Sequence, residues 1–332
     1  MTGTDRFPVV GIGASAGGVE ALEGFFRGLP AEPGLAIVIV THLSPERESM
    51  LHEIVARYSS LPVQIVVDAM PVRINHVYVL STNAELSIEN RHLRIHTNSS
   101  RRAHKPIDIF FSSLAVDLGE LSAGIILSGG DSDGTLGIKA IKERGGLTLA
   151  QTGNGYGPHH PDMPDSAIST GLVDFAIPVQ EMGARLVDFV RSTQAVTEDL
   201  AAATDSDEPT IDKAMPEIYG VLRNQVGHDF SGYKTRTFIR RVERRMQVTQ
   251  SHTVEGYVER LRREPQEVSA LFRDLLINVT NFFRDAEAFE SLAELVVPKL
   301  FDGRGADETV RVWVPGCSTG EEVYSIAILM RE

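Results

Sequence analysis

One glycine-rich turn constrains this 332-residue chain more than any other feature. The turn at residues 11–18, Gly-Ile-Gly-Ala-Ser-Ala-Gly-Gly, follows the apolar run 7–10 and precedes a helical pattern that continues to Leu29. Glycines at such a junction let a buried strand turn sharply into a helix, as in the first unit of a parallel α/β sheet. Ser15 lies in this turn, so its hydroxyl is either a nucleophile or a neighbour of a bound phosphate.

The first part of the chain alternates short β-rich runs with helical stretches. This pattern over residues 5–193 predicts an α/β domain with a doubly wound, mostly parallel sheet. Three short runs around the turn Glu89-Asn90 predict an antiparallel elaboration at one edge. We expect sheet strands at 7–11, 35–41, 63–67, 123–128 and 147–150, hairpin strands at 77–80, 85–88 and 91–95, and helices at 18–29, 47–59, 106–119, 134–144 and 180–192.

The rest of the chain changes character twice. Residues 194–214 are rich in Thr, Ala and Asp, which predicts a solvated acidic linker. Helical periodicity then predicts a small all-α domain at 215–301. Residues 308–332 hold a strand pattern, a glycine turn and an apolar helix, which predict the first β-α unit of a Rossmann-like domain. One strand and one helix cannot bury their apolar faces, so we expect poor packing there.

Composition excludes several classes of protein. The hydrophobic fraction of 42% is typical of a soluble globular protein, and the net charge of −13 argues against nucleic-acid binding. The longest apolar run, 35–40, is too short to span a bilayer, and the N-terminus has no signal-peptide pattern, so we expect a cytoplasmic protein without membrane insertion. A single cysteine, Cys317, excludes a disulfide framework, and we interpret it as a small residue packed in a turn.

Three polar residues follow three of the predicted strands. Ser15 follows the first strand, His42 follows the second, and Asp133 comes shortly after the strand at 123–128. Because the carboxyl ends of parallel strands meet at one edge of a sheet, these side chains are expected to lie close together. A hydroxyl, an imidazole and a carboxylate are the groups needed for acyl transfer, and residues 13–17 satisfy the G-x-S-x-G nucleophile pattern.

Each of these residues also has a plainer interpretation. The glycine turn roughly fits a dinucleotide loop, but the second strand ends in Thr41-His42 rather than in the acidic residue that binds ribose. His42 alone is more often a hydrogen-bonded polar residue than a base, and Asp133 alone is more often a helix N-cap. Residues 131–134 lack the later oxygen ligands of a cation loop, and the pair at 159–160 is expected to face solvent or substrate, so we predict no metal site.

Four motifs in combination resemble the catalytic domain of the chemotaxis protein-glutamate methylesterase (CheB-type). They are the serine turn and residues 41–45, 127–135 and 163–171. The resemblance implies Ser15 as nucleophile, His42 as general base and acid, and Asp133 as orienting carboxylate, with the Gly130 N–H in the oxyanion hole. It implies hydrolysis of glutamyl methyl esters, with glutamine deamidation as a second reaction, on a methyl-accepting chemoreceptor or similar sensory protein. No cofactor is implied for this reaction.

Two residues depart from that family's pattern. Ala16 stands where a hydroxyl residue often follows the nucleophile, and Gly130 stands where a bulkier residue is frequent. Neither change removes a triad member, so we expect activity and leave its rate open. The alternative function is a catalytically weak signalling scaffold that binds a receptor or a histidine kinase. Few residues precede the first strand, so control by phosphorylation of an N-terminal receiver domain is not expected.

A basic helix is predicted at residues 233–246, where Glu243 is the single acidic residue. Spacing of four places several of its cations along one helical face. A solvated face is the usual meaning of such a run, and an acidic protein partner would suit it equally well. The cations are Lys234, Arg236, Arg240, Arg241, Arg244 and Arg245.

The segments 276–285 and 313–325 resemble the chemotaxis receptor protein-glutamate O-methyltransferase (CheR-type). The resemblance covers its helical N-terminal domain and the opening of its S-adenosylmethionine domain, and makes the basic helix the receptor-recognition element. It implies cofactor contacts from Asn278, Thr280, Arg284 and Glu321. The later strands of that site are missing before Glu332, so we expect weak or no S-adenosylmethionine binding and no methyl transfer. The two opposing chemistries suggest sensory adaptation or a related signalling pathway.

Overall fold

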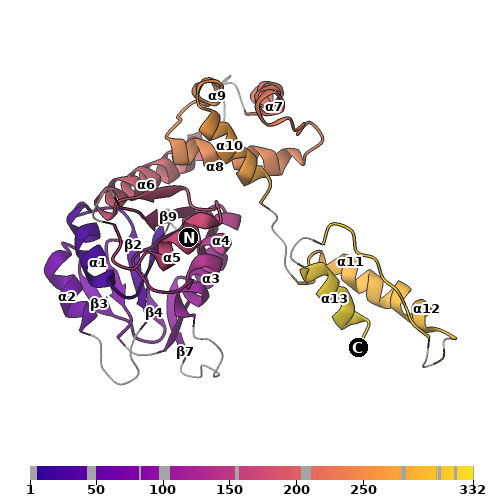
Figure 1. Cartoon of the computed structure of the whole chain (residues 1–332), viewed down its shortest axis with the longest axis horizontal. Coiled ribbons are helices and arrows are strands. Elements are labelled where there is room, and N and C mark those ends of the chain that lie inside the picture. The colour runs from indigo at the N-terminus through magenta and orange to yellow at the C-terminus, as the bar shows by residue number, and fades with distance from the viewer. Residues whose placement is uncertain are drawn as a thin grey trace. The chain divides into compact units, whose positions relative to one another are not determined.

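The computed structural model shows two compact units, Met1–Leu275 and Leu276–Glu332 (Figure 1). The described residues are 6–42, 50–81, 84–96, 105–153, 157–202, 211–277, 282–303, 305, 308–317 and 320–331, without the side chains of 194–202. The beginning of the helix predicted at 47–59 therefore lies outside the described residues, and its described part is α2, Leu51–Tyr58.

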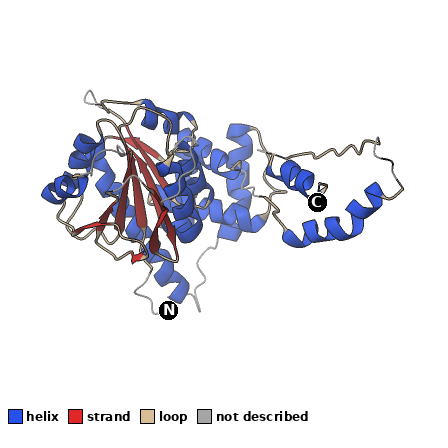
Figure 2. Cartoon of the chain, turned by 90° about the horizontal axis from the view of Figure 1, so that it is seen from below, coloured by secondary structure: helices blue, strands red, loops and turns tan. Residues whose placement is uncertain are grey.

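A seven-stranded sheet forms the centre of the first unit (Figure 2). Its order is β10-β9-β8-β1-β2-β5-β3, and every neighbouring pair of strands is parallel. This confirms the predicted α/β fold with a mostly parallel sheet. The strands are β1 (Val9–Ala14), β2 (Ala36–Thr41), β3 (Val63–Ile65), β5 (Val77–Val79), β8 (Ser122–Ile126), β9 (Leu147–Gln151) and β10 (Phe175–Ile177).

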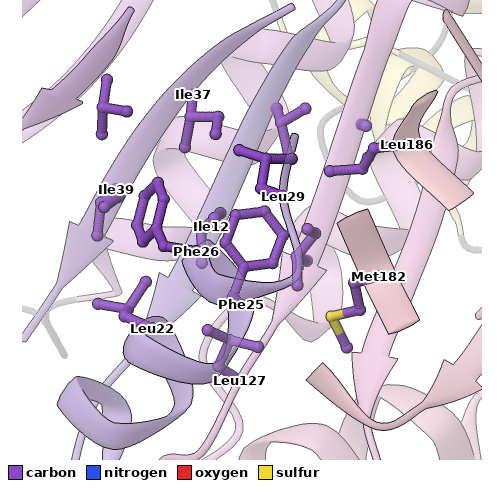
Figure 3. Close-up of a cluster of buried hydrophobic side chains, with 14 of the residues drawn as sticks. Ile12, Leu22, Phe25, Phe26, Leu29, Ile37, Ile39, Leu127, Met182 and Leu186 are labelled. Carbon is purple, nitrogen blue, oxygen red and sulfur yellow. The ribbon is translucent and has the colours of Figure 1, made fainter. Parts of the chain in front are cut away.

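Helices cover both faces of this sheet because its strands are apolar on both sides. Successive side chains of β1 point to opposite faces, so Val10 and Ile12 join one apolar cluster while Val9 joins the other. The first cluster packs α1 (Gly18–Arg27), α2 and α6 (Val179–Ala202) on the sheet, and Figure 3 shows Phe25 of α1 and Met182 of α6 within it. The second packs α3 (Pro106–Leu118), α4 (Thr135–Glu143) and α5 (Asp162–Ser169) on the opposite face.

A small antiparallel sheet lies apart from the parallel one. Its order is β4-β7-β6, from β4 (Met70–Pro71), β6 (Glu85–Glu89) and β7 (His92–His96). The run predicted as a hairpin strand at 77–80 is instead β5 of the main sheet, paired in parallel with β2 and β3. The reason is burial: Val77, Tyr78 and Val79 are all fully buried, which suits a strand between parallel neighbours. The hairpin turn itself uses Asn90 and Arg91, both with positive φ.

Four helices after the sheet domain pack around a separate apolar cluster, but belong to the same unit. They are α7 (Ile211–Val226), α8 (Thr235–Thr249), α9 (Val254–Arg263) and α10 (Pro265–Leu275). Phe230, Phe238 and Tyr257 lie in this cluster. The stretch predicted as a linker at 194–214 is helical up to Ala202, and residues 203–210 lie outside the described part.

The second unit contains short helices. They are α11 (Ala286–Ser291), a π-helical turn (Leu292–Val296), α12 (Val297–Phe301) and α13 (Glu321–Leu329). The unit boundary at Leu275 thus falls inside the all-α domain predicted at 215–301. The strand predicted at 310–314 pairs with no other strand among the described residues, and Trp313 is 87% exposed. A strand without a neighbour cannot complete its backbone hydrogen bonds. No described helix is long and apolar enough to cross a membrane.

Candidate active site

The site lies at the carboxyl ends of three adjacent strands of the parallel sheet. β1 lies between β2 and β8, and the loops after these strands carry Ser15, His42 and Asp133. From β1 the chain proceeds to β2 and returns later to β8 on the other side. Such a reversal of strand order opens a crevice at the carboxyl edge of the sheet, where ligands bind in open α/β folds.

Ser15, His42 and Asp133 form a continuous hydrogen-bonded chain. Ser15 Oγ lies 3.1 Å from His42 Nδ1, and His42 Nε2 lies 2.9 Å from Asp133 Oδ2. The His42 side chain is 25% exposed, whereas the Asp133 carboxylate is fully buried. An ionised carboxylate only accepts hydrogen bonds, so Nε2 carries the proton and Nδ1 is left to accept from the Ser15 hydroxyl.

The Asp133 carboxylate is held by backbone amides as well as by His42. The N–H groups of Ile107 and Asp108, at the start of α3, each donate to it at 3.0 Å, and the N–H of Gly134 donates at 2.9 Å. Burial disfavours the charged form, but the hydrogen bonds from His42 and from the amides of Ile107 and Asp108 hold the pKa of Asp133 below its usual value. Asp133 therefore caps α3, rather than the helix that follows it in sequence.

The imidazole of His42 lies among charges of both signs. Its hydrogen bond to Asp133 raises its pKa, burial opposes this, and the charges of Asp131 and Asp133 raise it further. Asp131 Oδ2 is 3.9 Å from Nδ1, and Asp131 Oδ1 accepts from the Asp133 N–H at 2.6 Å. Lys105 lowers the pKa of His42 and donates to Ser132 Oγ at 3.1 Å. The net effect is a pKa above the ordinary histidine value.

The nucleophile turn is held in place by Ser128, a residue that sequence reasoning did not select. The Ser15 N–H donates to the Ser128 carbonyl at 2.9 Å. Ser128 Oγ donates to the Ala16 carbonyl at 2.8 Å and accepts from the His160 N–H at 3.0 Å. Gly17 has φ of 75°, and a Cβ there would lie 2.7 Å from Ser128 Oγ, so only glycine suits this position.

Two backbone amides beside Ser15 have no hydrogen-bond partner among the described residues. After β8, the N–H of Ser128 is bonded to Gln151 Oε1 and that of Gly129 to the His160 carbonyl, so the first unpaired amide is that of Gly130. Gly130 also borders open space, because a Cβ there would meet no atom within 4 Å. The second unpaired amide is that of Ala16, directly before α1. Sequence reasoning missed Ala16 as a donor, although the nucleophile-elbow pattern predicts one there.

The first glycines of the turn serve packing within the sheet domain. A Cβ at Gly11 would lie 2.7 Å from Phe111, and one at Gly13 would lie 2.5 Å from Ile107. Both neighbours belong to α3, so these glycines let a helix approach β1 closely. This packing explains why positions 11 and 13 are glycines without a bound phosphate. The exposed histidine His159 faces Glu20, with 2.7 Å between Nε2 and Oε2.

The residues predicted to contact S-adenosylmethionine belong to the second unit. Asn278 and Thr280 lie outside the described residues. Arg284 is exposed and Glu321 is half-buried at the start of α13. The Phe283 N–H donates to Ser325 Oγ at 2.9 Å, and that hydroxyl donates to the Glu321 carbonyl at 2.7 Å. These bonds bring the two methyltransferase-like motifs together.

The basic stretch forms α8 with Lys234 directly before it, and the structure divides the six cations into two sets. Lys234, Arg236 and Arg240 are exposed, as a solvated or partner-binding face requires. The other three, Arg241, Arg244 and Arg245, are buried inside the first unit. The predicted solvated face is therefore wrong for these three arginines, because all of them are buried. Acidic residues distant in sequence pair with Arg244 and Arg245. Among the described residues, no group of acidic, histidine and cysteine side chains is arranged to hold a metal ion.

The fold and the site define an α/β domain with a serine-histidine-aspartate arrangement at the carboxyl edge of a parallel sheet. Residues 10–186 match the model of the CheB methylesterase family, and the chain belongs to this family. Residues 215–276 match the all-alpha domain of CheR methyltransferase, and residues 278–332 match its SAM-binding domain. The chain is thus a fusion of CheB-type and CheR-type sequences.

Two relatives match different shares of the chain. The chain is 34% identical over 293 residues to an uncharacterized 104.1 kDa protein in the hypE 3'region of Rhodobacter capsulatus, covering 83% of this chain and 31% of that protein. It is 31% identical over 189 residues to a protein-glutamate methylesterase/protein-glutamine glutaminase 2 of Burkholderia pseudomallei, covering 55% of this chain and 54% of the relative. The chain therefore spans 31% and 54% of the lengths of these two relatives.

A solved structure shares the fold of the sheet domain. It is the CheB methylesterase catalytic domain of Thermotoga maritima, with a TM-score of 0.52 and 25% sequence identity. The match covers 56% of this chain and all of the Thermotoga domain.

Proposed function

We propose that this chain is a protein-glutamate methylesterase in which Ser15, His42 and Asp133 form the catalytic triad. The observation that carries the proposal is the hydrogen-bonded chain from Ser15 Oγ through both nitrogens of His42 to the buried Asp133 carboxylate. Membership of the CheB methylesterase family and the similarity to the protein-glutamate methylesterase of Burkholderia pseudomallei support the same reaction.

In the first half of the reaction, Ser15 Oγ attacks the carbonyl carbon of a glutamyl methyl ester. His42 Nδ1 takes the hydroxyl proton, and Asp133 stabilises the resulting imidazolium. The N–H groups of Gly130 and Ala16 would donate to the oxyanion. Collapse of the tetrahedral intermediate breaks the bond to the methoxy oxygen, which receives the proton from His42 and leaves as methanol. The glutamyl group remains esterified to Ser15.

In the second half, water attacks the acyl carbonyl and His42 Nδ1 takes one of its protons. The bond between the carbonyl carbon and Ser15 Oγ then breaks, and His42 returns the proton to the serine. The products are the regenerated Ser15 hydroxyl and a glutamic acid side chain, which releases its proton to solvent and becomes a carboxylate, so one water is consumed for each methanol released. Glutamine would follow the same steps with ammonia as the leaving group.

The substrate class that we infer is a methyl-accepting chemoreceptor or a similar sensory protein, with a histidine kinase as a further partner. CheB-type and CheR-type sequences in one chain support this inference, because the two families act on the same receptor glutamates in opposite directions. We infer that this reaction takes place in the cytoplasm.

The methyltransferase part carries a SAM-binding family match, so S-adenosylmethionine is the cofactor relevant to it. The described residues do not fit a complete site, since residues 310–314 pair with no strand and Trp313 is exposed. We expect little or no S-adenosylmethionine binding by this chain. Isothermal titration of the 332-residue chain measures this, and micromolar binding would contradict it.

Methanol release from a methylated receptor fragment tests the esterase. We expect Ser15→Ala and His42→Ala each to abolish release, while Ser169→Ala leaves it unchanged, because Ser169 is an exposed serine on α5. Retained release in Ser15→Ala would overturn the triad. Receptor binding without turnover in the wild-type chain would instead favour the scaffold.

A further inference from the structure

The buried arginines of α8 meet the sheet domain at a fully buried carboxylate, Asp174. This residue directly precedes β10. Arg244 Nη2 lies 2.6 Å from Asp174 Oδ2, and Arg245 Nη1 lies 3.3 Å from Oδ1. Lys142, from α4 of the sheet domain, donates to the same carboxylate at 2.6 Å. Asp174 thus joins cations from two parts of the chain.

Arg244 makes further contacts with the sheet domain that use the shape of its guanidinium group. Nη2 donates to the Gly146 carbonyl at 2.7 Å, and Nε donates to the Gly145 carbonyl at 3.2 Å. Both carbonyls belong to the turn between α4 and β9. Its remaining nitrogen, Nη1, donates to Asp274 of α10 at 2.7 Å. A lysine could not reproduce this pattern, because it lacks the planar fork of donors.

The interface is balanced in charge. Lys142 also pairs with Asp274 at 2.8 Å, across the boundary between sheet domain and helices. Arg245 makes two bonds to Glu267, at 2.9 and 2.6 Å. The set therefore contains three cations, Lys142, Arg244 and Arg245, and three carboxylates, Asp174, Glu267 and Asp274. Buried charges are tolerated only when they are paired in this way. We call this set the latch.

The latch lies at the opposite end of the sheet from the candidate active site. Gly146 precedes β9 and Asp174 precedes β10, so both mark the amino ends of parallel strands. Ser15 and His42 follow the carboxyl ends of β1 and β2. Docking of the helices therefore leaves the triad uncovered.

One cation of α8 is not satisfied by the latch. Arg241 is 2% exposed, and its Nε and Nη1 have no hydrogen-bond partner in the described part of the chain. A buried donor without a partner is unfavourable. When the helices are docked on the sheet domain, Arg241 of α8 therefore keeps guanidinium donors without a partner among the described residues. Carboxylates of a protein partner would pair them, and the exposed Lys234, Arg236 and Arg240 extend the same basic helix.

We propose that α8 has two mutually exclusive partners: the acidic end of the sheet domain at Asp174, and a segment of another protein rich in carboxylates. In the docked state Arg244 is buried against Asp174 and two backbone carbonyls of the sheet domain, so an acidic segment can reach this arginine only after the helices leave the sheet domain. The inference does not rest on the esterase reaction, because it concerns residues at the other end of the sheet.

A substitution in the sheet domain that weakens the latch tests, in the full chain, whether the two partners of α8 exclude each other. Asp174→Asn removes the charge shared by three cations, while Asp165→Asn, an exposed aspartate on α5, is the matched control. Hydrogen exchange of the α8 amides measures docking, with the β8 amides as an internal standard for a folded sheet. Fluorescence anisotropy with labelled 15-residue poly-L-glutamate, at constant ionic strength, measures binding of an acidic segment.

We expect Asp174→Asn to speed exchange in α8 and to lower the Kd for poly-L-glutamate by about tenfold or more, because the binding-competent population rises. Asp165→Asn should change neither the exchange rate of the α8 amides nor the Kd for poly-L-glutamate. Unchanged exchange in α8 would overturn the latch, and faster exchange with an unchanged Kd would overturn the mutual exclusion. If Asp174→Asn also exposed β8, Lys142→Met opens the latch from α4 and is judged by the same two readings.

Discussion

His42 presents Nδ1 to Ser15 and Nε2 to Asp133, at 3.1 and 2.9 Å. The order matters because only one tautomer leaves Nδ1 able to accept the serine proton. That tautomer persists as long as Asp133 accepts the proton on Nε2. The orientation of the base therefore depends on the charge of a single buried carboxylate.

Replacing that carboxylate by an amide tests this dependence. Asp133→Asn places an N–H donor against His42 and favours the wrong tautomer, so we expect kcat to fall by about 10³–10⁴-fold, as in other serine-histidine-aspartate enzymes. Methanol release under single-turnover conditions measures it, with thermal melting to establish the folded fraction. A loss of less than tenfold in folded protein would rule out the proposed role.

Asp131 is expected to set the acid limb of the pH profile. Its carboxylate, 51% exposed, lies 3.9 Å from His42 Nδ1 and stabilises the imidazolium. Asp131→Asn removes this charge but can still accept from the Asp133 N–H, so the pKa of His42 should fall. Because neutral imidazole is the active base, the acid limb of kcat/KM should move to lower pH.

The matched control for Asp131→Asn is Asp229→Asn. Asp229 is an exposed aspartate that also accepts from the N–H two residues on, that of Ser231 at 2.9 Å. It lies among the helices, so its replacement should leave the pH profile unchanged. Added salt should diminish the effect of Asp131, since exposed charges are screened. A shift of the acid limb to higher pH in Asp131→Asn would contradict the assignment.

Ser128 is expected to act as a positioning residue for the nucleophile. Ser128→Ala removes the bonds of its hydroxyl to Ala16 and His160, and a small displacement of Ser15 can reduce kcat by up to about 10²-fold. Ser128→Thr keeps the hydroxyl and should restore kcat. KM should change little in both variants. Equal kcat for the alanine and threonine variants would show that the hydroxyl does not position the turn.

The sheet edge was predictable because its signals are local. Alternating apolar residues and the glycine turn fix strand ends, and strand ends carry Ser15, His42 and Asp133. The burial of Arg244 could not be predicted in this way. Its partner Asp174 is 70 residues away, and such a distant pair produces no periodic pattern in the sequence. The same limit applied to Ser128, whose hydroxyl joins three loops. Residues 77–79 were misassigned because a fully apolar run does not indicate which strands flank it.

Stability should depend on Arg244 far more than on Arg240, one turn away on the same helix. Arg244→Met leaves Asp174 and Asp274 short of a buried partner, and breaking such a pair costs about 3–5 kcal/mol. Arg240 is exposed and 3.9 Å from Glu120, so Arg240→Met should cost about 0–1 kcal/mol. Urea unfolding measures both free energies. Similar losses for the two variants would indicate that the ion pairs of Arg244 contribute little.

Acid should weaken the latch. Burial disfavours the charged form of Asp174, but the nearby charges of Arg244 and Lys142 outweigh it and hold its pKa below the usual value. Because the pKa of Asp174 is lower in the folded state than in the unfolded state, its ionisation stabilises the folded protein at pH values above the unfolded-state pKa of aspartate. This stabilisation is lost as the pH falls through the folded-state pKa. We expect Asp174→Asn to flatten the fall in melting temperature below about pH 4. If Asp174→Asn left the dependence of melting temperature on pH unchanged, this contribution of Asp174 to stability would be refuted.

The capping of α3 by Asp133 has a consequence for reading related sequences. The carboxylate that orients His42 also accepts the first amides of a core helix, so its loss would weaken the fold as well as the reaction. A relative that had abandoned catalysis would still be selected to keep this aspartate. Retention of Asp133 is therefore evidence of a shared fold, and Ser15 and His42 are the positions that distinguish an active homologue from an inactive one.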